Sequence, residues 1–309
     1  MSEKKQNISL MGCIGAGKSS VAAELEKYGY RIITAGQLFR QYAKDHHMSI
    51  EEAISGHPEI DAEIDSNIAR IGKEENGIVF DSRMAWHFVP DSFKVFIYTD
   101  IDTAAERVFA AKRDTEQFVN VKECEKHIFS RQLSELSNYT KLYGQDYMDS
   151  KNYDLFIDTT YATPEQTAKK IIDCMEHQQA KFQMNPRSLY PTQTIRDLSG
   201  ETLNKYLAKE LPAGNICISC YGGYFGVTDG HHRYLAAAIN KEPFIGAEYD
   251  PSPEKSKIVC KTEIYNYEDV AGFYYPAYPE DFSKDCLIEF CNENFPDQKE
   301  KDPQIEMDL

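Results

Sequence analysis

The segment GCIGAGKSS, residues 12–20, has the residue types and the spacing of a phosphate-binding loop. Its glycines let backbone N–H groups turn inward around phosphate oxygens, and the helix expected after it adds the partial positive charge of a helix N-terminus. Lys18 can reach the outer phosphates of a nucleotide, Ser19 can offer its hydroxyl to Mg²⁺, and Ser20 can contact the nucleotide. The glycines of this loop are Gly12, Gly15 and Gly17. The sequence therefore predicts that ATP and Mg²⁺ bind here.

A second candidate site lies in TDGHHRYLAAAIN, residues 228–240, which predicts a turn followed by a helix. Asp229, His231, His232 and Arg233 gather in the expected turn, where imidazole and guanidinium groups could hold a phosphate. The alternative is a capped helix start with histidines on the surface. Two phosphate turns in one chain favour two nucleotide-handling domains joined in series.

The elements that must position the first loop alternate between strands and helices up to about residue 178. Strands are expected at 7–11, 30–33, 77–81, 94–99 and 153–158, and helices at 18–28, 35–47, from 49, 58–75, 102–113, 122–143 and from Thr163, which is expected as the helix cap. Such alternation predicts an α/β fold, with a parallel sheet and helices on both of its faces. Asp81 ends the third strand, where it could face the metal through water; the alternative is that it caps a helix.

The alternation breaks at 178–194, a stretch that contains two prolines, and a domain boundary is expected there. The second domain is expected to be a small α+β fold. Its helices are expected at 200–209 and after DGHHR, and its strands at 215–220, 224–228, 244–249 and 257–264. The predicted domains are 1–178 and 179–290, followed by an acidic tail at 291–309.

The composition of the chain limits its partners. The formal net charge of the 309 residues is −16, and no run of Lys or Arg is present, which argues against a nucleic acid partner. The N-terminal sequence shows neither a signal peptide nor a membrane-spanning segment, so we expect a cytoplasmic protein without a membrane partner. Cys217 and Cys220 lie on an expected strand, where buried thiols are favoured over a redox or zinc role. The sequence does not specify an oligomeric state.

From Gly12 to about Asp158 the chain resembles cytidylate kinases, especially the archaeal-type (d)CMP kinases. The resemblance rests on stretches that follow one another in order: ITAGQLFRQYAKDHHMSIEEA, HPEIDAEID, FDSRMAW, ERVFAAKRD and LYGQDYMDSKNYDLFIDTT. It implies a P-loop nucleoside monophosphate kinase fold. It also implies transfer of the γ-phosphoryl group of ATP to CMP, dCMP or a similar acceptor, with Mg²⁺.

The same resemblance assigns roles to several arginines, which suit bidentate phosphate contacts. Arg40 and Arg83 are expected at the phosphate of the acceptor. Arg83 is also expected to be catalytic, together with Lys18 of the loop and Arg131 of the helix expected at 122–143, which is expected to be part of the lid. The partners that the resemblance implies are nucleotide and small-molecule substrates.

The lid region of the chain departs from this family. Arg107 and Arg113 precede the lid, where the resemblance implies that they surround the transferred phosphate. The alternative for each of them is a surface ion pair. Ser137 and Asn138 stand near a position where an arginine is expected, and Lys141 would have to replace it as a point charge. The acceptor could therefore be a different phosphorylated small molecule.

Residues 185 to about 275 resemble the ParB/sulfiredoxin-like fold, above all its free-serine-kinase branch. The resemblance rests on MNPRSLYPTQTI and GGYFGVTDGHHRYLAAAIN. It implies that His231, His232 and Arg233 hold the phosphates of ADP or another nucleotide. It further implies that Asp229 serves the metal or the acceptor hydroxyl as a catalytic residue.

Two departures limit what this second resemblance implies. His231 stands where sulfiredoxin needs a cysteine, which excludes sulfinic-acid repair. Gln193 stands where a glutamate is expected in the serine kinases, and glutamine cannot act as a general base. The second domain therefore either binds nucleotide without turnover or uses another carboxylate such as Asp229.

The leading interpretation is an ATP-dependent phosphotransferase that acts on a nucleoside monophosphate and carries a second nucleotide-binding domain. A bifunctional enzyme, with a kinase activity in each domain, is one form of it. One alternative is a small-molecule kinase for serine or a polyol, centred on the DGHHR domain. Another is a nucleotide-binding regulator with weak or no catalysis. The residues that favour chemistry in the first domain are Lys18, Ser19, Asp81, Arg40 and Arg83.

Overall fold

The structure is a computed structural model that describes residues 5–54, 58–111, 118–193, 198–221 and 224–251. It divides into two compact units, residues 1–179 and 180–309. Arg113, the strand expected at 257–264 and the tail expected at 291–309 lie outside the described residues. No described helix combines the length and the apolar sequence that a membrane span needs.

The first unit is built on parallel strands that pair in the order β2-β3-β1-β4-β5. They are β1 (Ile8–Gly12), β2 (Arg31–Thr34), β3 (Ile78–Asp81), β4 (Phe93–Tyr98) and β5 (Leu155–Asp158). Every residue of β1 and β5 is buried, as expected where helices cover both faces of a parallel sheet. The carboxyl ends of all these strands lie at one edge, which is where ligands bind in such sheets.

The helices of the first unit begin and end close to the predicted residues. They are α1 (Lys18–Lys27), α2 (Ala35–Asp45), α3 (Ile50–Ile54), α4 (Pro58–Glu74), α5 (Ala85–Phe88), α6 (Ile101–Ala110), α7 (Val121–Tyr143), the short 3₁₀ helix η1 (Ser150–Asn152) and α8 (Pro164–Glu176). The sequence does not predict α5. The prediction that Thr163 caps a helix is confirmed, because its side chain accepts from Gln166 N at the start of α8.

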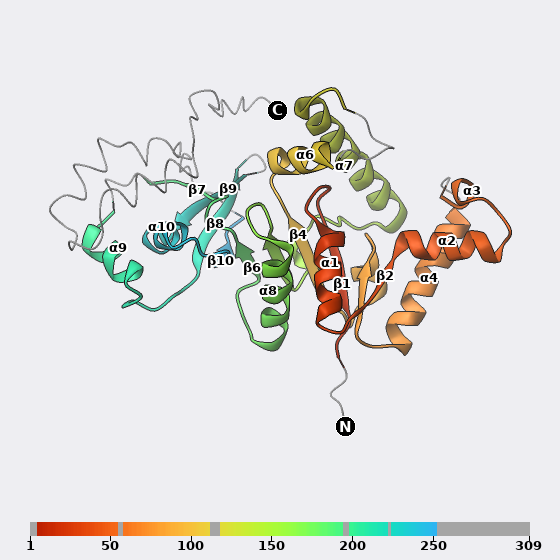
Figure 1. The fold of residues 1–309 in the computed structure, drawn as a ribbon, viewed down its shortest axis with the longest axis horizontal. Coiled ribbons are helices and arrows are strands. Elements are labelled where there is room, and N and C mark those ends of the chain that lie inside the picture. The colour runs from red at the N-terminus through yellow and green to blue at the C-terminus, as the bar shows by residue number, and fades with distance from the viewer. Residues whose placement is uncertain (1–4, 55–57, 112–117, 194–197, 222–223, 252–309) are drawn as a thin grey trace. The chain divides into compact units, whose positions relative to one another are not determined.

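Helix α4 covers one face of this sheet and α1 covers the other. Ile78 and Phe80 of β3 share one face, and both belong to an apolar cluster with Ile64 and Ile68 of α4. Val79 points to the opposite face, where α1 contacts β1, β2 and β3 and lies beside α8 (Figure 1). The predicted α/β fold is therefore confirmed for the first unit.

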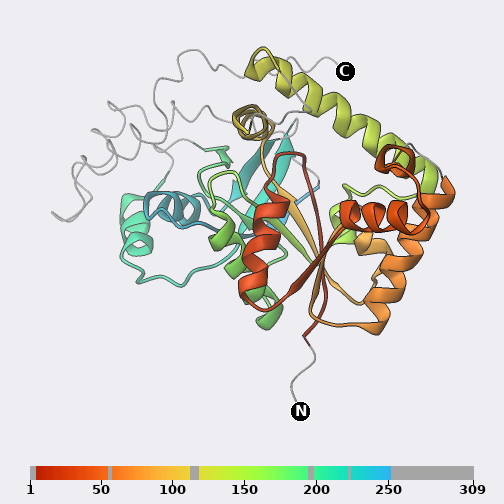
Figure 2. The ribbon, with the colours of Figure 1, turned by 45° about the vertical axis from the view of Figure 1, so that its right-hand side comes forward.

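The 23-residue helix α7 packs on α6 and extends toward α4 (Figure 2). Ala105 and Val108 of α6 meet Cys124 and Ile128 of α7 in an apolar cluster. Cys124 and Ile128 are the buried residues of α7, so the apolar contacts of α7 with α6 come from its N-terminal half. The C-terminal half of α7 carries polar side chains that belong to the site.

The second unit contains a mixed sheet whose described strands pair in the order β6-β10-β8-β9-β7. They are β6 (Phe182–Met184), β7 (Tyr190–Pro191), β8 (Ile216–Tyr221), β9 (Tyr224–Asp229) and β10 (Ile245–Tyr249). The described helices are α9 (Gly200–Leu207) and α10 (His231–Ile239). β8 and β9 form an antiparallel pair, and α10 follows directly from β9 through Gly230.

One expectation about the second unit is corrected. Helix α10 begins at His231, so the sequence HHR forms its first turn and does not form a turn before it. The stretch 178–194, in which the domain boundary is expected, also contains β6 and β7. Pro191 has no backbone N–H to donate to a neighbouring strand. It is accommodated because β7 lies at the edge of the described sheet and pairs with β9 alone, and proline in sheets is found at such edges.

Candidate active site

The phosphate-binding loop runs from the end of β1 to the start of α1. Its first part is fixed to the sheet by a hydrogen bond of 3.0 Å from Cys13 N to the carbonyl oxygen of Ile97 in β4. Gly17 precedes α1 with a φ of 85°, and no side chain caps the helix. The backbone N–H groups in the first turn of α1 are therefore available to a phosphate, at the positive end of the helix.

The side chain of Lys18 folds over this loop. Its Nζ donates to the carbonyl oxygen of Gly12 at 3.1 Å. Burial lowers the pKa of Lys18, while the carboxylate of Asp81 acts in the opposite direction. The guanidinium groups of Arg83 and Arg131 lower this pKa further. Several cationic side chains thus converge where the phosphates of a bound nucleotide would carry negative charge.

Ser19 and Asp81 meet beside the loop. The Ser19 hydroxyl donates to Asp81 Oδ2 at 3.3 Å, which joins the start of α1 to the end of β3. A hydroxyl and a carboxylate are oxygen donors of the kind that Mg²⁺ accepts together with water and phosphate oxygens, so this pair fits that ion. The alternative reading of Asp81 as a helix cap is wrong, because Met84 is the residue that precedes α5.

A cavity of about 460 Å³ opens over the loop and is called the donor cavity below. Its lining includes Lys18, Ser19, Ser20, Arg83, Arg107, Arg131 and Thr159. Arg107 donates to the carbonyl oxygens of Thr159 at 2.7 Å and Thr160 at 3.0 Å. The Thr159 hydroxyl lies 2.9 Å from the carbonyl oxygen of Ala16 and donates to it. Arg107 therefore holds the turn after β5 in place as a wall of this cavity.

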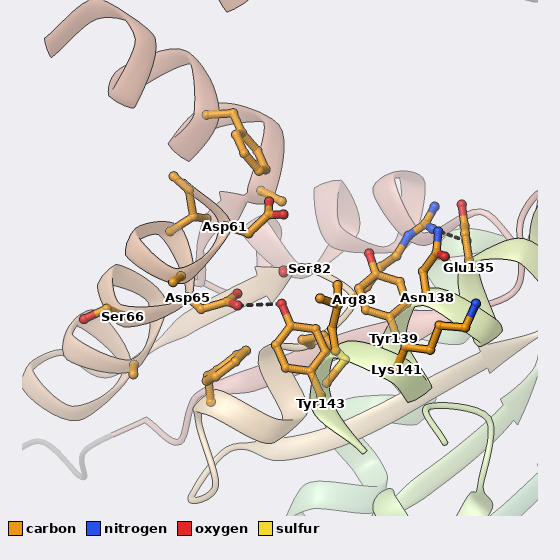
Figure 3. A pocket seen from close by; sticks show the side chains of 18 residues that line it. Asp61, Asp65, Ser66, Ser82, Arg83, Glu135, Asn138, Tyr139, Lys141 and Tyr143 are labelled. Atoms are coloured by element: carbon orange, nitrogen blue, oxygen red, sulfur yellow. Dashed lines mark hydrogen bonds and ion pairs between the residues drawn. The ribbon is translucent and has the colours of Figure 1, made fainter. Parts of the chain in front are cut away.

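A larger cavity of about 960 Å³, called the acceptor cavity below, lies between α4 and α7 (Figure 3). Asp61 and Asp65, one helical turn apart on α4, line one side of it together with Tyr143 of α7. The Tyr143 hydroxyl donates to Asp65 Oδ2 at 2.8 Å. Burial raises the pKa of Asp61 and of Asp65, and burial followed by the bond to Asp65 raises the pKa of Tyr143. This side of the cavity offers hydrogen-bond acceptors that suit amine or hydroxyl groups of a ligand.

The basic residues expected at the acceptor take different positions. Arg83 lies in the turn after β3 and lines both cavities. Arg40 is an exposed residue of α2, which contributes Ala35 and Phe39 to the described lining of the acceptor cavity. Lys141, the expected replacement for a missing arginine, also lines this cavity. Arg83 is therefore the predicted arginine that stands at the junction of the two cavities.

Glu135 of α7 joins two of the predicted arginines. Its Oε1 accepts from Arg131 Nε at 3.0 Å, one helical turn away. Its Oε2 forms an ion pair with Arg83 from the turn after β3 (Figure 3). The Glu135 side chain is only 16% exposed, so the carboxylate is held at the junction and is partly shielded from water.

The sequence patterns predict no role for Asp61, Asp65, Glu135 or Tyr143. A signal for three of them is present in the sequence, because Asp65 follows Asp61 by four residues and Glu135 follows Arg131 by four. Side chains at this spacing share one face of a helix. The spacing does not reveal which helix face meets a cavity, and so the role of these residues emerges only from the fold.

In the second unit, both candidate histidines accept hydrogen bonds from the main chain. His231 is buried, and its Nε2 accepts from Thr192 N at 3.2 Å. His232 Nε2 accepts from Ser199 N at 2.9 Å. The two imidazoles therefore attach Thr192 and Ser199 to the first turn of α10, and the Nε2 atom of each imidazole already has a protein partner.

The other two candidate residues of this turn lie nearer the surface. Arg233 NH2 lies 3.6 Å from Asp229 Oδ2, and the Asp229 side chain is 77% exposed. Gln193 is also exposed. His231, His232 and Arg233 are the residues expected to hold a phosphate here. Of these, Arg233 forms an ion pair with the exposed Asp229 carboxylate at the start of α10.

A model of the cytidylate kinase-like family matches residues 7–161, about half of the chain. The chain belongs to the cytidylate kinase-like family. It is 37% identical over 163 residues to the cytidylate kinase of Pyrococcus abyssi, a match that covers 51% of this chain and 87% of that protein. The loop geometry and this family make the first unit an ATP-dependent kinase. The family match ends within the first unit.

Two further similarities accompany this kinase. An S-adenosylmethionine-dependent nucleotide dehydratase of Lacinutrix mariniflava is 31% identical over 174 residues, which cover 55% of this chain and 36% of that protein. A solved shikimate kinase from Bacteroides thetaiotaomicron is 16% identical with a TM-score of 0.42, over 56% of this chain and 99% of that one. The second similarity is too low to inform on function.

Proposed function

We propose that the first unit transfers the γ-phosphoryl group of ATP to a nucleoside monophosphate, with CMP or dCMP as the acceptor. The observation that supports this most directly is the position of Arg83, whose side chain lines both the donor and the acceptor cavity. A donor phosphate in one cavity and an acceptor phosphate in the other would face each other across this guanidinium group. Phosphoryl transfer requires such positioning together with positive charge around the moving group.

The residues of the donor side have complementary roles in this proposal. The loop glycines and the first turn of α1 would bind the phosphates of ATP, and Lys18 would contact the outermost one. Ser19 and Asp81 would hold Mg²⁺, which neutralises phosphate charge when it is bound. Arg83 and Arg131 would stabilise the charge on the transferred group.

The acceptor side supports cytosine as the base. The carboxylates of Asp61 and Asp65 can accept hydrogen bonds, and they lie on the side of the acceptor cavity opposite Arg83 and Glu135 (Figure 3). Cytosine carries an exocyclic amine that donates hydrogen bonds at the position where uracil carries an acceptor oxygen. An acceptor with its phosphate toward Arg83 and an amine toward Asp65 would therefore satisfy both ends of the cavity.

We propose that the second unit is a ParB/sulfiredoxin-like domain that binds a nucleotide. The observation in its favour is the direct passage from β9 through Gly230 to α10, with Asp229 and Arg233 paired at this point. The exposed Asp229 carboxylate would be the catalytic group if this unit also phosphorylates serine or a polyol. Binding without turnover would make the unit a nucleotide-dependent regulator of the first.

The test is a phosphoryl-transfer assay with the full chain, ATP and Mg²⁺ against CMP, dCMP, UMP, AMP, serine and a simple polyol. We expect ADP formation with CMP or dCMP, and its loss in Lys18→Ala. Lys27→Ala is the matched control, because Lys27 lies on the same helix with its side chain 70% exposed and paired with Glu24. Arg233→Ala should leave this activity in place.

The other outcomes separate the competing functions. Phosphorylation of serine or the polyol that disappears in Arg233→Ala and persists in Lys18→Ala would make the second unit the working kinase. Binding of ATP without turnover of any acceptor would support the regulator and overturn the proposed acceptor.

A further inference from the structure

The junction of the two cavities concentrates positive charge. Lys18 and Arg131 line the donor cavity, and Arg83 lines both cavities. The charges of Arg83 and Arg131 are close enough to lower the pKa of Lys18, after the larger effect of burial. Like charges at such short range repel one another, and partial burial strengthens this repulsion. The Asp81 carboxylate offsets part of this effect at Lys18, but Arg83 and Arg131 need a negative charge of their own to stay together before any phosphate arrives.

Glu135 supplies that negative charge from α7. One carboxylate oxygen binds Arg131 on its own helix at 3.0 Å, and the other binds Arg83 on the turn after β3. The side chains of Arg83 and Glu135 are 27% and 16% exposed. A pair this shielded holds its geometry better than a surface ion pair, which water and salt weaken. Glu135 therefore ties α7 to the core of the first unit at the phosphate site.

We propose that Glu135 is a positioning residue for phosphoryl transfer, which orients Arg83 and Arg131 toward the transferred phosphoryl group. It acts through the two arginines and does not need to touch a substrate. It keeps both guanidinium groups at the junction while the cavities are empty, so that less reorganisation is needed when the phosphates bind. This inference rests on the proposed function, because it assumes that a phosphoryl group passes the junction.

This role predicts a specific split between turnover and binding. Loss of the Glu135 charge should leave the loop, Lys18 and Ser19 in place, so the nucleotide still binds. Removing a negative charge beside the phosphates should even favour their binding. The two arginines lose their common partner, however, and misplacement of such groups lowers turnover by about 10- to 100-fold.

The test compares Glu135→Gln, Glu135→Asp and wild type in the full chain. Glu135→Gln keeps the shape of the side chain and removes its charge, and we expect kcat with CMP to fall about 10- to 100-fold. We expect the dissociation constant of MgADP to stay the same or decrease. Glu135→Asp keeps the charge and should retain more of kcat than Glu135→Gln does. Calorimetric titration of each variant with MgADP measures this dissociation constant.

The matched control is Glu74→Gln on α4. Glu74 pairs with Arg70 at 2.8 Å in the same i,i+4 arrangement, but both side chains are more than half exposed and neither lines a described cavity. This variant should keep the kcat of wild type. Thermal unfolding of all variants identifies any loss that comes from an unfolded protein.

Two results would overturn the inference. One is a kcat of Glu135→Gln within about twofold of wild type. The other is a fall in kcat that comes with an equal loss of MgADP affinity and a lower melting temperature, since a merely structural residue behaves in this way. If wild type phosphorylates no monophosphate, the proposed function fails, and the same panel is then measured on the slow hydrolysis of ATP. Unchanged hydrolysis in Glu135→Gln would then overturn the inference separately.

Discussion

Gly12 lies against the main-chain carbonyl group of Ile97, at the point where β1 pairs with β4. A Cβ atom at Gly12 would overlap this carbonyl oxygen, whereas a Cβ atom at Gly17 would meet no atom within 4 Å. Position 12, at the start of the phosphate-binding loop, thus requires glycine because no space is left for a Cβ atom. Position 17, at the end of the loop, requires glycine because its backbone is left-handed, with a φ of 85°.

The two glycines are therefore expected to differ in the cost of substitution. Gly12→Ala should lower the free energy of unfolding by about 3 kcal/mol, because a rigid strand has to move. Gly17→Ala should lower it by about 1–2 kcal/mol through backbone strain alone. Urea unfolding of both variants measures the difference, and an equal or larger loss for Gly17→Ala would contradict the explanation.

Lys18→Met is expected to stabilise the protein while it abolishes phosphoryl transfer. Burial lowers the pKa of Lys18 in the folded state, so the charged form is penalised there, and wild-type stability rises as the pH climbs from that lowered pKa toward about 10.4. The variant lacks this penalty. Thermal unfolding should show a higher melting temperature than wild type at pH 7, with a gap that narrows toward pH 10. A less stable variant at pH 7 would contradict the prediction.

Asp81→Asn is expected to weaken the response to Mg²⁺. The variant keeps a hydrogen-bond acceptor for the Ser19 hydroxyl but loses the negative charge that would face the metal. The concentration of Mg²⁺ needed for half-maximal activity should rise about 10- to 100-fold. Calorimetric titration of the ATP-bound protein with Mg²⁺ provides a readout without turnover. Asp91→Asn, an exposed carboxylate outside both cavities, serves as the control.

Asp65→Asn is expected to change the choice of acceptor. A carboxylate accepts from an amine at either oxygen, while the amide of asparagine also presents donors to the base. The ratio of kcat/KM for CMP over UMP should fall about tenfold or more.

Stability gives a second readout for the same substitution. Burial raises the pKa of Asp65 in the folded state, so the ionised carboxylate costs stability, and wild-type stability falls as the pH rises from about 3.9 through the raised pKa. Asp65→Asn should therefore be at least as stable as wild type at pH 7. Asp45→Asn, at the exposed end of α2, should leave the ratio unchanged. An unchanged ratio in Asp65→Asn would remove this residue from base selection.

The pH response of the second unit should depend on His232. Burial lowers the pKa of this imidazole, which keeps it neutral as the acceptor for Ser199 N. The stability that this bond contributes is complete above pH 6.5 and is lost as the pH falls from there through the lowered pKa. Hydrogen exchange at the Ser199 amide should therefore accelerate, relative to intrinsic rates, between pH 6.5 and 5.

His232→Ala tests the same bond by removing the acceptor. At pH 7.5 the free energy of opening at Ser199 should fall by about 0.5–1.5 kcal/mol, and its dependence on pH below 6.5 should disappear. His127→Ala, on the exposed side of α7 in the first unit, should change neither quantity. Protection at Ser199 that is equal in His232→Ala and wild type would contradict the assignment.

Much of the first unit follows from the sequence alone. The phosphate-binding loop, Lys18, Ser19 and the strand that ends in Asp81 were predicted from local patterns. Local patterns suffice here because a glycine loop between a strand and a helix builds its site from neighbouring residues and their own backbone. The alternation of strands and helices likewise predicted the parallel sheet, since that order restricts the possible connections.

The acceptor side of the site was decided by tertiary structure. Arg83 and Glu135 are far apart in the chain, and only the packing of α7 over the edge of the sheet brings their charges together. The same packing directs Asp65 toward Tyr143 and leaves Arg40 exposed on α2. In the second unit, the fold buries His231, and its Nε2 accepts a hydrogen bond from Thr192 N. A sequence determines which groups share a helix face, but the face that meets a cavity depends on contacts between distant segments.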